Sequence, residues 1–147
     1  MLQKMKNRLK DQRGLTLIEL LAVIVILGII AAIAIPSIMG VIDKSKEDAV
    51  KSDAIQILNS AKIYVASEKS ATQIEWEDLA SYVDLSGTTV TDTTEKPFFA
   101  TVTSGNSITL TGSITKDGKT LNLNNANLTA IQDASFSGNT GTAGVTP

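Results

Sequence analysis

The chain has 147 residues, enough for one domain, with 43% hydrophobic residues, 4% aromatic residues and a net charge of -2. It contains no Cys and no His, which excludes disulfides, thiol nucleophiles, the usual zinc sites and a histidine general base. Residues 1–14 hold five basic side chains against one acidic side chain, and the remainder holds eight lysines against fourteen acids. The acidic remainder gives no strong signal for nucleic-acid binding, which needs a basic face.

The first segment, residues 1–14 (MLQKMKNRLKDQRG), is basic and directly precedes a long apolar run. Such a segment is typical of a targeting and topology signal. Because basic residues stay on the cytoplasmic side, we expect the N-terminus inside and the chain beyond Ile42 outside.

The apolar run has no charged residue in the 23 positions from Leu20 to Ile42. As a helix it would measure about 34 Å, enough to cross a bilayer core of about 30 Å. Thirteen Leu, Ile and Val residues lie between Leu17 and Ile35. They favour insertion by about 4 to 8 kcal/mol, against a cost of about 3 kcal/mol for a central charge. Residues 15–42 are therefore predicted to be a transmembrane segment despite Glu19.

Three ordinary interpretations of this run compete. It could be a signal anchor, or a secretory signal peptide cut at the A-x-A site Ala32-Ile33-Ala34. A buried core helix is disfavoured because the remaining domain is small. None of the three accounts for Glu19, or for Arg13-Gly14 directly before the apolar run.

The stretch RGLTLIELLAVIVILGIIAAIAIPSI resembles the class III signal of type IV pilins and pseudopilins, over about residues 8–45. In that family a membrane peptidase cuts after the Gly that ends a basic leader, and then N-methylates the new terminal residue. The resemblance implies that residues 1–14 are removed by cleavage between Gly14 and Leu15, and that Leu15 is methylated. Thr16 and Pro36 also occupy family positions, whereas the usual first mature residue is Phe and here is Leu.

Glu19 acquires a role through this resemblance. The family implies that Glu19 of an incoming subunit pairs with the Leu15 amine of the subunit before it, which fixes the axial register of a filament. Each charge alone is costly in lipid, and pairing relieves both. Pairing within one helix, four residues apart, is a second option, and a tolerated charge near the membrane interface is a third.

Gly28, Pro36 and Gly40 are predicted points where this helix can bend or loosen. Pro36 lacks an N–H donor and its ring clashes with the carbonyl of Ala32. Gly28 lowers helix stability by about 1 kcal/mol relative to Ala. The alternative is that Gly and Pro are simply common in membrane helices.

From Asp43 the pattern becomes amphipathic, with lysines and acidic residues on the opposite face to the apolar ones. The apolar positions recur at steps of three and four residues: Ala49, Val50, Ala54, Ile57, Leu58, Ala61, Tyr64 and Val65. No breaker separates this pattern from Gly40. One continuous helix is therefore predicted from about Leu15 to about Ser67, about 80 Å long.

The remaining chain predicts a small α+β head over residues 43–136. A short helix or turn carries Trp76, Leu79, Tyr82 and Val83. Strands follow at 97–102, 107–114 and 119–124, with Asp117-Gly118 as a hairpin turn and 127–131 as an optional fourth strand. The expected fold is a long N-terminal helix packed on an antiparallel sheet of three to four strands. Residues 137–147, rich in Gly and Thr, are predicted to be a flexible tail.

We find no catalytic constellation, and expect no enzyme activity, cofactor or metal site. GxxxxGK[ST], GxGxxG and GxSxG are all absent. The candidate acidic groups are Glu75, Glu77 and Asp78, interpreted as a solvated face, and Asp84, Asp92 and Glu95, whose spacing matches no calcium loop. Asn127-Leu128-Thr129 is a weak glycosylation sequon.

The resemblance implies a prepilin that polymerises into a type IV pilus-like surface filament for adhesion, motility or DNA uptake. Its expected partners are copies of itself, the prepilin peptidase and methyltransferase, an assembly platform protein with its ATPase, and the membrane. The precursor would lie in the cytoplasmic membrane and the mature form in an extracellular filament.

Two alternatives remain open for the function. The first is a pseudopilin of a type II secretion or competence machine. Major secretion pseudopilins usually carry a stretch like DPWGxPY, and only EKPFF occurs here, which favours the pilus. DNA uptake would prefer exposed basic patches, and the outer domain after the long helix offers few basic residues, among them Lys96, Lys116 and Lys119. The second alternative is a membrane-anchored or secreted binding domain that never polymerises.

Overall fold

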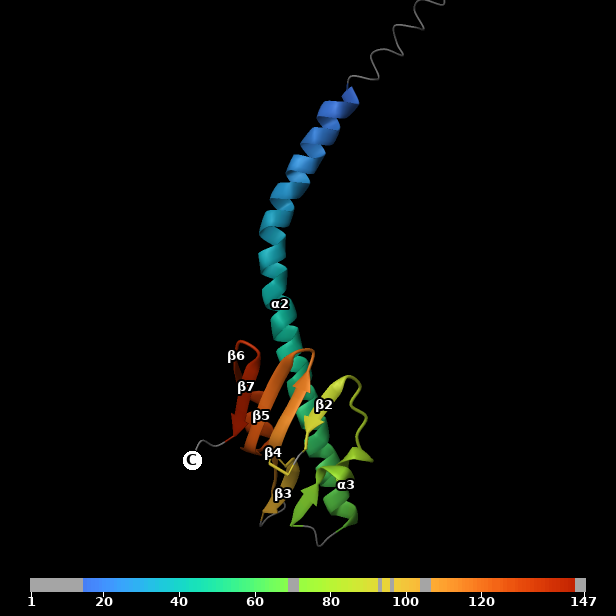
Figure 1. The fold of residues 1–147 in the computed structure, drawn as a ribbon, viewed down its shortest axis with the longest axis vertical. Helices are drawn as coiled ribbons and strands as arrows, with labels where there is room; N and C mark the ends of the chain where they lie inside the picture. Colours follow the sequence, from blue (N-terminus) through green and yellow to red (C-terminus); the bar gives the residue numbers. More distant parts are fainter. Residues whose placement is uncertain (1–14, 69–71, 93, 96, 104–106, 145–147) are drawn as a thin grey trace, which may run out of the picture. The chain divides into compact units, whose positions relative to one another are not determined.

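The computed structural model describes residues 15–68, 72–92, 94–95, 97–103 and 107–144, and divides into two compact units, Met1–Ile42 and Asp43–Pro147 (Figure 1). Helix α2, Leu15–Ser67, contributes to both units and is continuous through Pro36. This confirms the predicted long helix. We call residues 15–42 its apolar half, residues 43–67 its amphipathic half, and Asp43–Pro147 the head unit. The predicted leader, residues 1–14, lies outside the described residues.

The head unit combines the amphipathic half of α2 with a seven-stranded sheet and two short helices (Figure 1). The strands are β1 (Gln73–Glu75), β2 (Thr88–Thr91), β3 (Phe99–Thr103), β4 (Ser107–Lys116), β5 (Lys119–Ala126), β6 (Ser135–Ser137) and β7 (Thr140–Gly144). The helices are α3 (Trp76–Ala80) and α4 (Leu128–Gln132). This confirms the predicted α+β class.

The sheet order is β1-β3-β4-β5-β7-β6, and β2 pairs with β4 beyond the end of β3. All pairs are antiparallel except β5 with β7. The three strands expected from the sequence are β3, β4 and β5, and the sheet extends beyond them on both sides. β4 and β5 join through Asp117 and Gly118, both at positive φ, as the hairpin signal predicted.

Two predictions about the C-terminal region were wrong. The optional fourth strand at 127–131 is helix α4, because the Asn127 side chain accepts a hydrogen bond from the Ala130 N–H at 2.9 Å and so caps a helix. The predicted tail contains β7, which pairs in parallel with β5. Its inward positions are Gly141 and Ala143, and a Cβ at Gly141 would lie 2.7 Å from the Phe136 ring. Because these buried residues are Gly and Ala, the sequence lacks the alternation of large apolar and polar residues that predicts a strand.

The core of the head unit lies between the amphipathic half of α2 and the inner face of the sheet. Helix α2 supplies Val50, Ala54, Ile57, Leu58, Ala61 and Val65, all buried as the periodicity predicted. The largest buried side chain is Phe98, whose ring meets Trp76 edge-on at 5.5 Å between centroids. A Cβ at Gly112 would lie 2.4 Å from the Phe98 ring, and Gly112 has a φ of 140°, so only Gly suits this position.

Candidate functional site

The apolar half of α2 is the first candidate site because its side chains have no packing partner within the described chain. From Leu17 to Ile42 every side chain except Ala34 is exposed. The large hydrophobic residues range from 49% exposed at Ile42 to 77% at Leu17. By length and composition α2 could cross a membrane. Surface of this kind requires lipid or other protein chains around it.

Glu19 is the only charged residue in the apolar half, and it is exposed in the single chain. It lies one helical turn from Leu15, the first residue of α2. Gly14, the residue before the predicted cut, lies outside the described residues. The structure therefore places Glu19 on the same helix as the predicted new terminus, and its pairing with that terminus stays a prediction.

The predicted bending points Gly28 and Gly40 have no packing reason to be Gly in the single chain. A Cβ built at either position meets no atom within 4 Å. Pro36 lies within α2, where it removes one backbone donor. Their role as points of flexibility stays a prediction.

In the head unit, Asp53 connects α2 to two strands. Its Oδ2 accepts a hydrogen bond from Lys116 Nζ of β4 at 2.7 Å and a short one from Thr88 Oγ1 of β2. The Asp53 side chain is 11% exposed and that of Lys116 is 21% exposed. The sequence analysis missed this group by assigning acidic residues to the solvent face. Asp53 follows Val50 by three residues and precedes Ile57 by four, so the helical period itself places it on the buried face.

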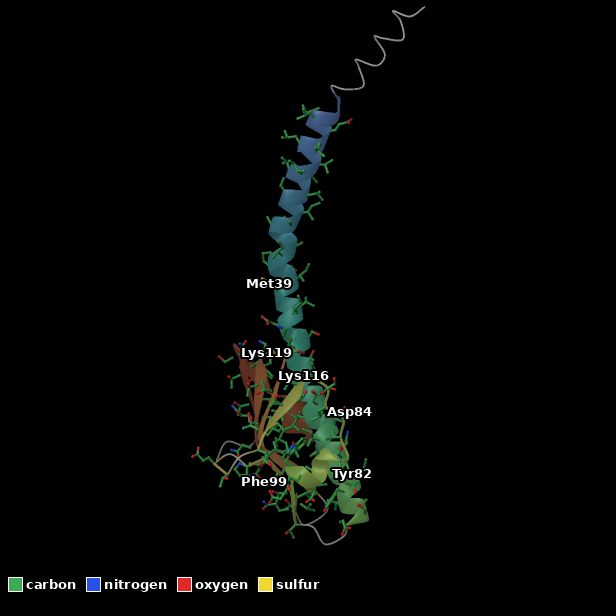
Figure 2. The ribbon with its side chains drawn as sticks, turned by 45° about the vertical axis from the view of Figure 1, so that its right-hand side comes forward. Met39, Tyr82, Asp84, Phe99, Lys116 and Lys119 are labelled. Carbon is green, nitrogen blue, oxygen red and sulfur yellow. The ribbon has the colours of Figure 1, made fainter. Side chains whose placement is uncertain are left out.

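Lys119 pairs with Lys116 across the β4–β5 hairpin and is the centre of a second buried polar group (Figure 2). Its Nζ donates to the Gly138 carbonyl at 2.8 Å and lies 3.4 Å from Glu47 Oε1 and 3.6 Å from Asp43 Oδ1. Its side chain is 5% exposed. Lys116 and Lys119 were expected to be exposed basic residues of the head, and this was wrong because both are used in internal ion pairs. Lys96 lies outside the described residues.

The acidic clusters from the sequence do not form a common site. Glu77 and Asp78 lie exposed in the first turn of α3, and Glu75 accepts a hydrogen bond from Gln73 at 3.0 Å. Asp92 Oδ1 accepts from the Phe98 N–H at 3.0 Å, which stabilises the loop before β3. Among the described residues no group of three acidic side chains could hold a metal ion.

One tyrosine near the end of α2 has a shifted pKa. Partial burial raises the pKa of the Tyr64 hydroxyl above its ordinary value of 10.0, and the carboxylates of Asp78 and Glu68 raise it further. Tyr64 meets Tyr82 edge-on at 5.7 Å between ring centroids. The two rings therefore pack against each other beside the C-terminal end of α2.

The described head unit also has a groove of about 510 Å³. It lies on the outward face of the sheet, and five of its eleven described lining residues are threonines of β2, β4, β5 and β7. The sequence analysis did not identify it. The signal was the run of Thr and Ser residues at alternate positions of "SITLTGSITK" and its neighbouring strands.

Comparisons with known proteins agree with the N-terminal features. The family described as "Prokaryotic N-terminal methylation motif" matches residues 9–35, which include Gly14, Leu15, Glu19 and Gly28. The chain is 40% identical over 57 residues to "Type II secretion system core protein G" of Klebsiella michiganensis, covering 39% of this chain and 40% of that protein. The protein of the same description from Escherichia coli is 38% identical over 53 residues, covering 36% and 37%. That from Aeromonas hydrophila is 40% identical over 55 residues, covering 37% and 38%.

The chain thus spans about two fifths of the length of the curated relatives that it matches. No solved structure matches it. The methylation motif, the relatives and the exposed apolar helix agree with one another. The chain therefore carries a prokaryotic N-terminal methylation motif at residues 9–35 and resembles the secretion-system relatives over this N-terminal region.

Proposed function

We propose that this chain is a non-catalytic structural subunit that is cut between Gly14 and Leu15, methylated at Leu15 and polymerised through the apolar half of α2. The membrane holds this half before assembly, and neighbouring copies hold it afterwards. The precursor lies in the cytoplasmic membrane with its head outside. The partners are a prepilin peptidase, further copies of the chain, and an assembly platform driven by an external ATPase.

The observation that carries the proposal is the apolar half with its single carboxylate. An ordinary membrane anchor would gain nothing from Glu19, since a charge in a helix end still costs free energy in lipid. A filament subunit gains a partner for it, because cleavage creates an ammonium at Leu15 that also needs one. The matching methylation motif covers both positions and supports this interpretation.

The secretion pseudopilus is the filament that the relatives support best. Their printed names describe a core protein of a type II secretion system. The sequence analysis favoured a pilus because a stretch like DPWGxPY is missing, and gave the pseudopilin as its alternative. The comparisons support that alternative better than the pilus.

The test is the intact mass of the protein sheared from cells, with its N-terminal peptide sequenced by mass spectrometry. A methylated terminus at Leu15 is expected. A terminus at Ile35 would identify a cut secretory signal, and an uncut Met1 would identify an anchored domain; either would contradict the proposal. Deleting the gene then separates the two filaments, because loss of secreted enzymes from the medium with normal surface pili indicates a pseudopilus.

A further inference from the structure

The outward face of the sheet presents two rows of polar side chains across four strands. All carry a hydroxyl group except Asn122, which carries an amide, and we call them the hydroxyl rows. The first row follows the strand register from Thr89 to Thr115, Thr120 and Thr140. The second row follows it from Thr91 to Ser113, Asn122 and Thr142. Neighbouring strands lie about 4.8 Å apart and the two rows about 7 Å apart along the strands. The four strands lie side by side in Figure 1.

This face is concave where the groove of about 510 Å³ lies, a volume within the range of about 300 to 1,000 Å³ typical of small-molecule sites. Seven of its eleven described lining residues carry a hydroxyl or an amide, and none of the eleven is charged. The aromatic residue among the described lining residues is Phe99, which pairs across the sheet with Thr111 and is half-buried (Figure 2). Its neighbour Phe98 points the other way, into the core.

The lining selects one class of ligand. The described lining residues offer no charged partner for phosphates or carboxylates, which proteins bind with Arg, Lys or helix ends. A purely apolar ligand would leave the hydroxyl groups without hydrogen bonds, which is costly. An extended peptide binds through main-chain hydrogen bonds at a sheet edge. Here the backbone groups of β4 and β5 are already paired on both sides, so the face offers side chains alone.

Sugars match all of these features. A neutral sugar ring presents hydroxyl groups, which can donate to and accept from Thr, Ser and Asn side chains. Its C–H faces can stack on an aromatic ring such as Phe99. Thr115 Oγ1 and Thr120 Oγ1 already lie 3.0 Å apart in one hydrogen bond, and each hydroxyl retains capacity for another partner. We propose that this groove, between Phe99 and the hydroxyl rows, binds a neutral oligosaccharide segment of a polysaccharide.

The first experiment is saturation-transfer difference NMR on the full chain, kept in a detergent that has no sugar headgroup. The probes are cellotriose, maltotriose, triacetylchitotriose and the charged trigalacturonate. At least one neutral trisaccharide is expected to bind, and trigalacturonate at least about tenfold more weakly. If no neutral sugar binds, or if the charged one binds equally well, the proposal is wrong. Displacement of the sugar by an extended Thr-rich peptide of equal affinity would also overturn it.

Variants then locate the site. Thr120→Val keeps strand propensity and removes one hydroxyl group, and is expected to weaken binding by about threefold to tenfold. Phe99→Ala is expected to weaken it by about tenfold through the loss of stacking. Thr101→Val is the matched control, because Thr101 lies on β3 outside the groove lining. If Thr101→Val weakens binding as much as Thr120→Val, the groove is not the site. Thr120→Val decides the question if Phe99→Ala fails to fold, and neither result depends on filament assembly.

Discussion

The two halves of helix α2 have the same backbone conformation and opposite surroundings. In the apolar half the large side chains are 49% to 77% exposed, and in the amphipathic half Val50, Ala54 and Ile57 are completely buried. The amphipathic half finds its partner, the sheet, within its own chain. The apolar half has no such partner within the described residues, and exposed apolar surface of this extent is typical of an interaction site.

The difference shows why one helix needs two kinds of sequence. A helix that packs on one side only needs a polar opposite face, and the lysines and acids after Asp43 supply it. A helix that is surrounded by apolar material, first lipid and then protein, needs apolar side chains on all sides. Glu19 is the charged exception in the apolar half. Substituting it is therefore the most direct way to test whether the two halves of the helix have different roles.

The largest expected effect is that of Glu19→Ala. Insertion and cleavage should continue, because the aliphatic residues outweigh a single terminal charge and Gly14 is unchanged. Filament assembly should fall at least tenfold, because the Leu15 amine of each neighbouring subunit loses its partner in an apolar setting. Electron microscopy and quantification of sheared protein measure this. The melting temperature of the head unit should not change.

Glu19→Asp is the matched control, because it retains the charge on a shorter side chain and should retain part of the assembly. Normal filaments from Glu19→Ala would show that Glu19 is only a tolerated charge. The apolar half would then act as an anchor alone.

Ile57→Ala should have the second-largest effect, on the other half of the helix. Ile57 is fully buried against the sheet, so the truncation should lower the unfolding free energy of the head unit by about 2 to 5 kcal/mol. Ile30→Ala is the matched change in the apolar half, where the side chain is 56% exposed, and should change it by less than about 0.5 kcal/mol. Urea unfolding followed by circular dichroism measures both. Equal effects would mean that the apolar half also packs within the single chain.

Asp53→Asn should have a smaller effect within the amphipathic half. It keeps the shape of the side chain and removes the charge that Lys116 contacts at 2.7 Å. Because both side chains are largely buried, the expected cost is about 1 to 3 kcal/mol of unfolding free energy. Adding Lys116→Met should recover part of the loss, with a coupling of about 0.5 kcal/mol or more in a double-mutant cycle. Strict additivity would show that Asp53 acts through Thr88 alone.

Much of the fold could be predicted because periodicity is a strong signal in this chain. The length of α2, its buried positions and the β3–β4–β5 meander all follow from apolar spacing and one Asp-Gly turn. β7 could not be predicted, because Gly141 and Ala143 give no apolar alternation. Helix α4 is only five residues long, and its cap at Asn127 is a weaker signal than the strand pattern around it.

The candidate site residues also fall into a group that the sequence reveals and a group that only the folded structure reveals. Glu19, Gly28 and Pro36 stand out in the sequence because each interrupts a uniform apolar run. Lys119 does not stand out, because its burial depends on which segments lie against it. The helical period places Asp53 on the buried face, but its partners Lys116 and Thr88 become its neighbours only in the folded sheet. The groove depends on register across β2, β4, β5 and β7, and only the folded sheet brings these rows together.

The smallest expected effect tests whether the apolar half must loosen when it moves from lipid into a filament. Gly28→Ala introduces a methyl group that meets no atom within 4 Å in the single chain, so it should stabilise the helix locally by about 1 kcal/mol without a clash. Amide hydrogen exchange at residues 28–36 should slow, and filament yield should fall severalfold while insertion and cleavage stay unchanged. Gly40→Ala, with equally open surroundings, tests the other predicted glycine bending point in the same way. Slower exchange with an unchanged filament yield would show that a stiffer helix assembles equally well, and that Gly28 is not a required point of flexibility.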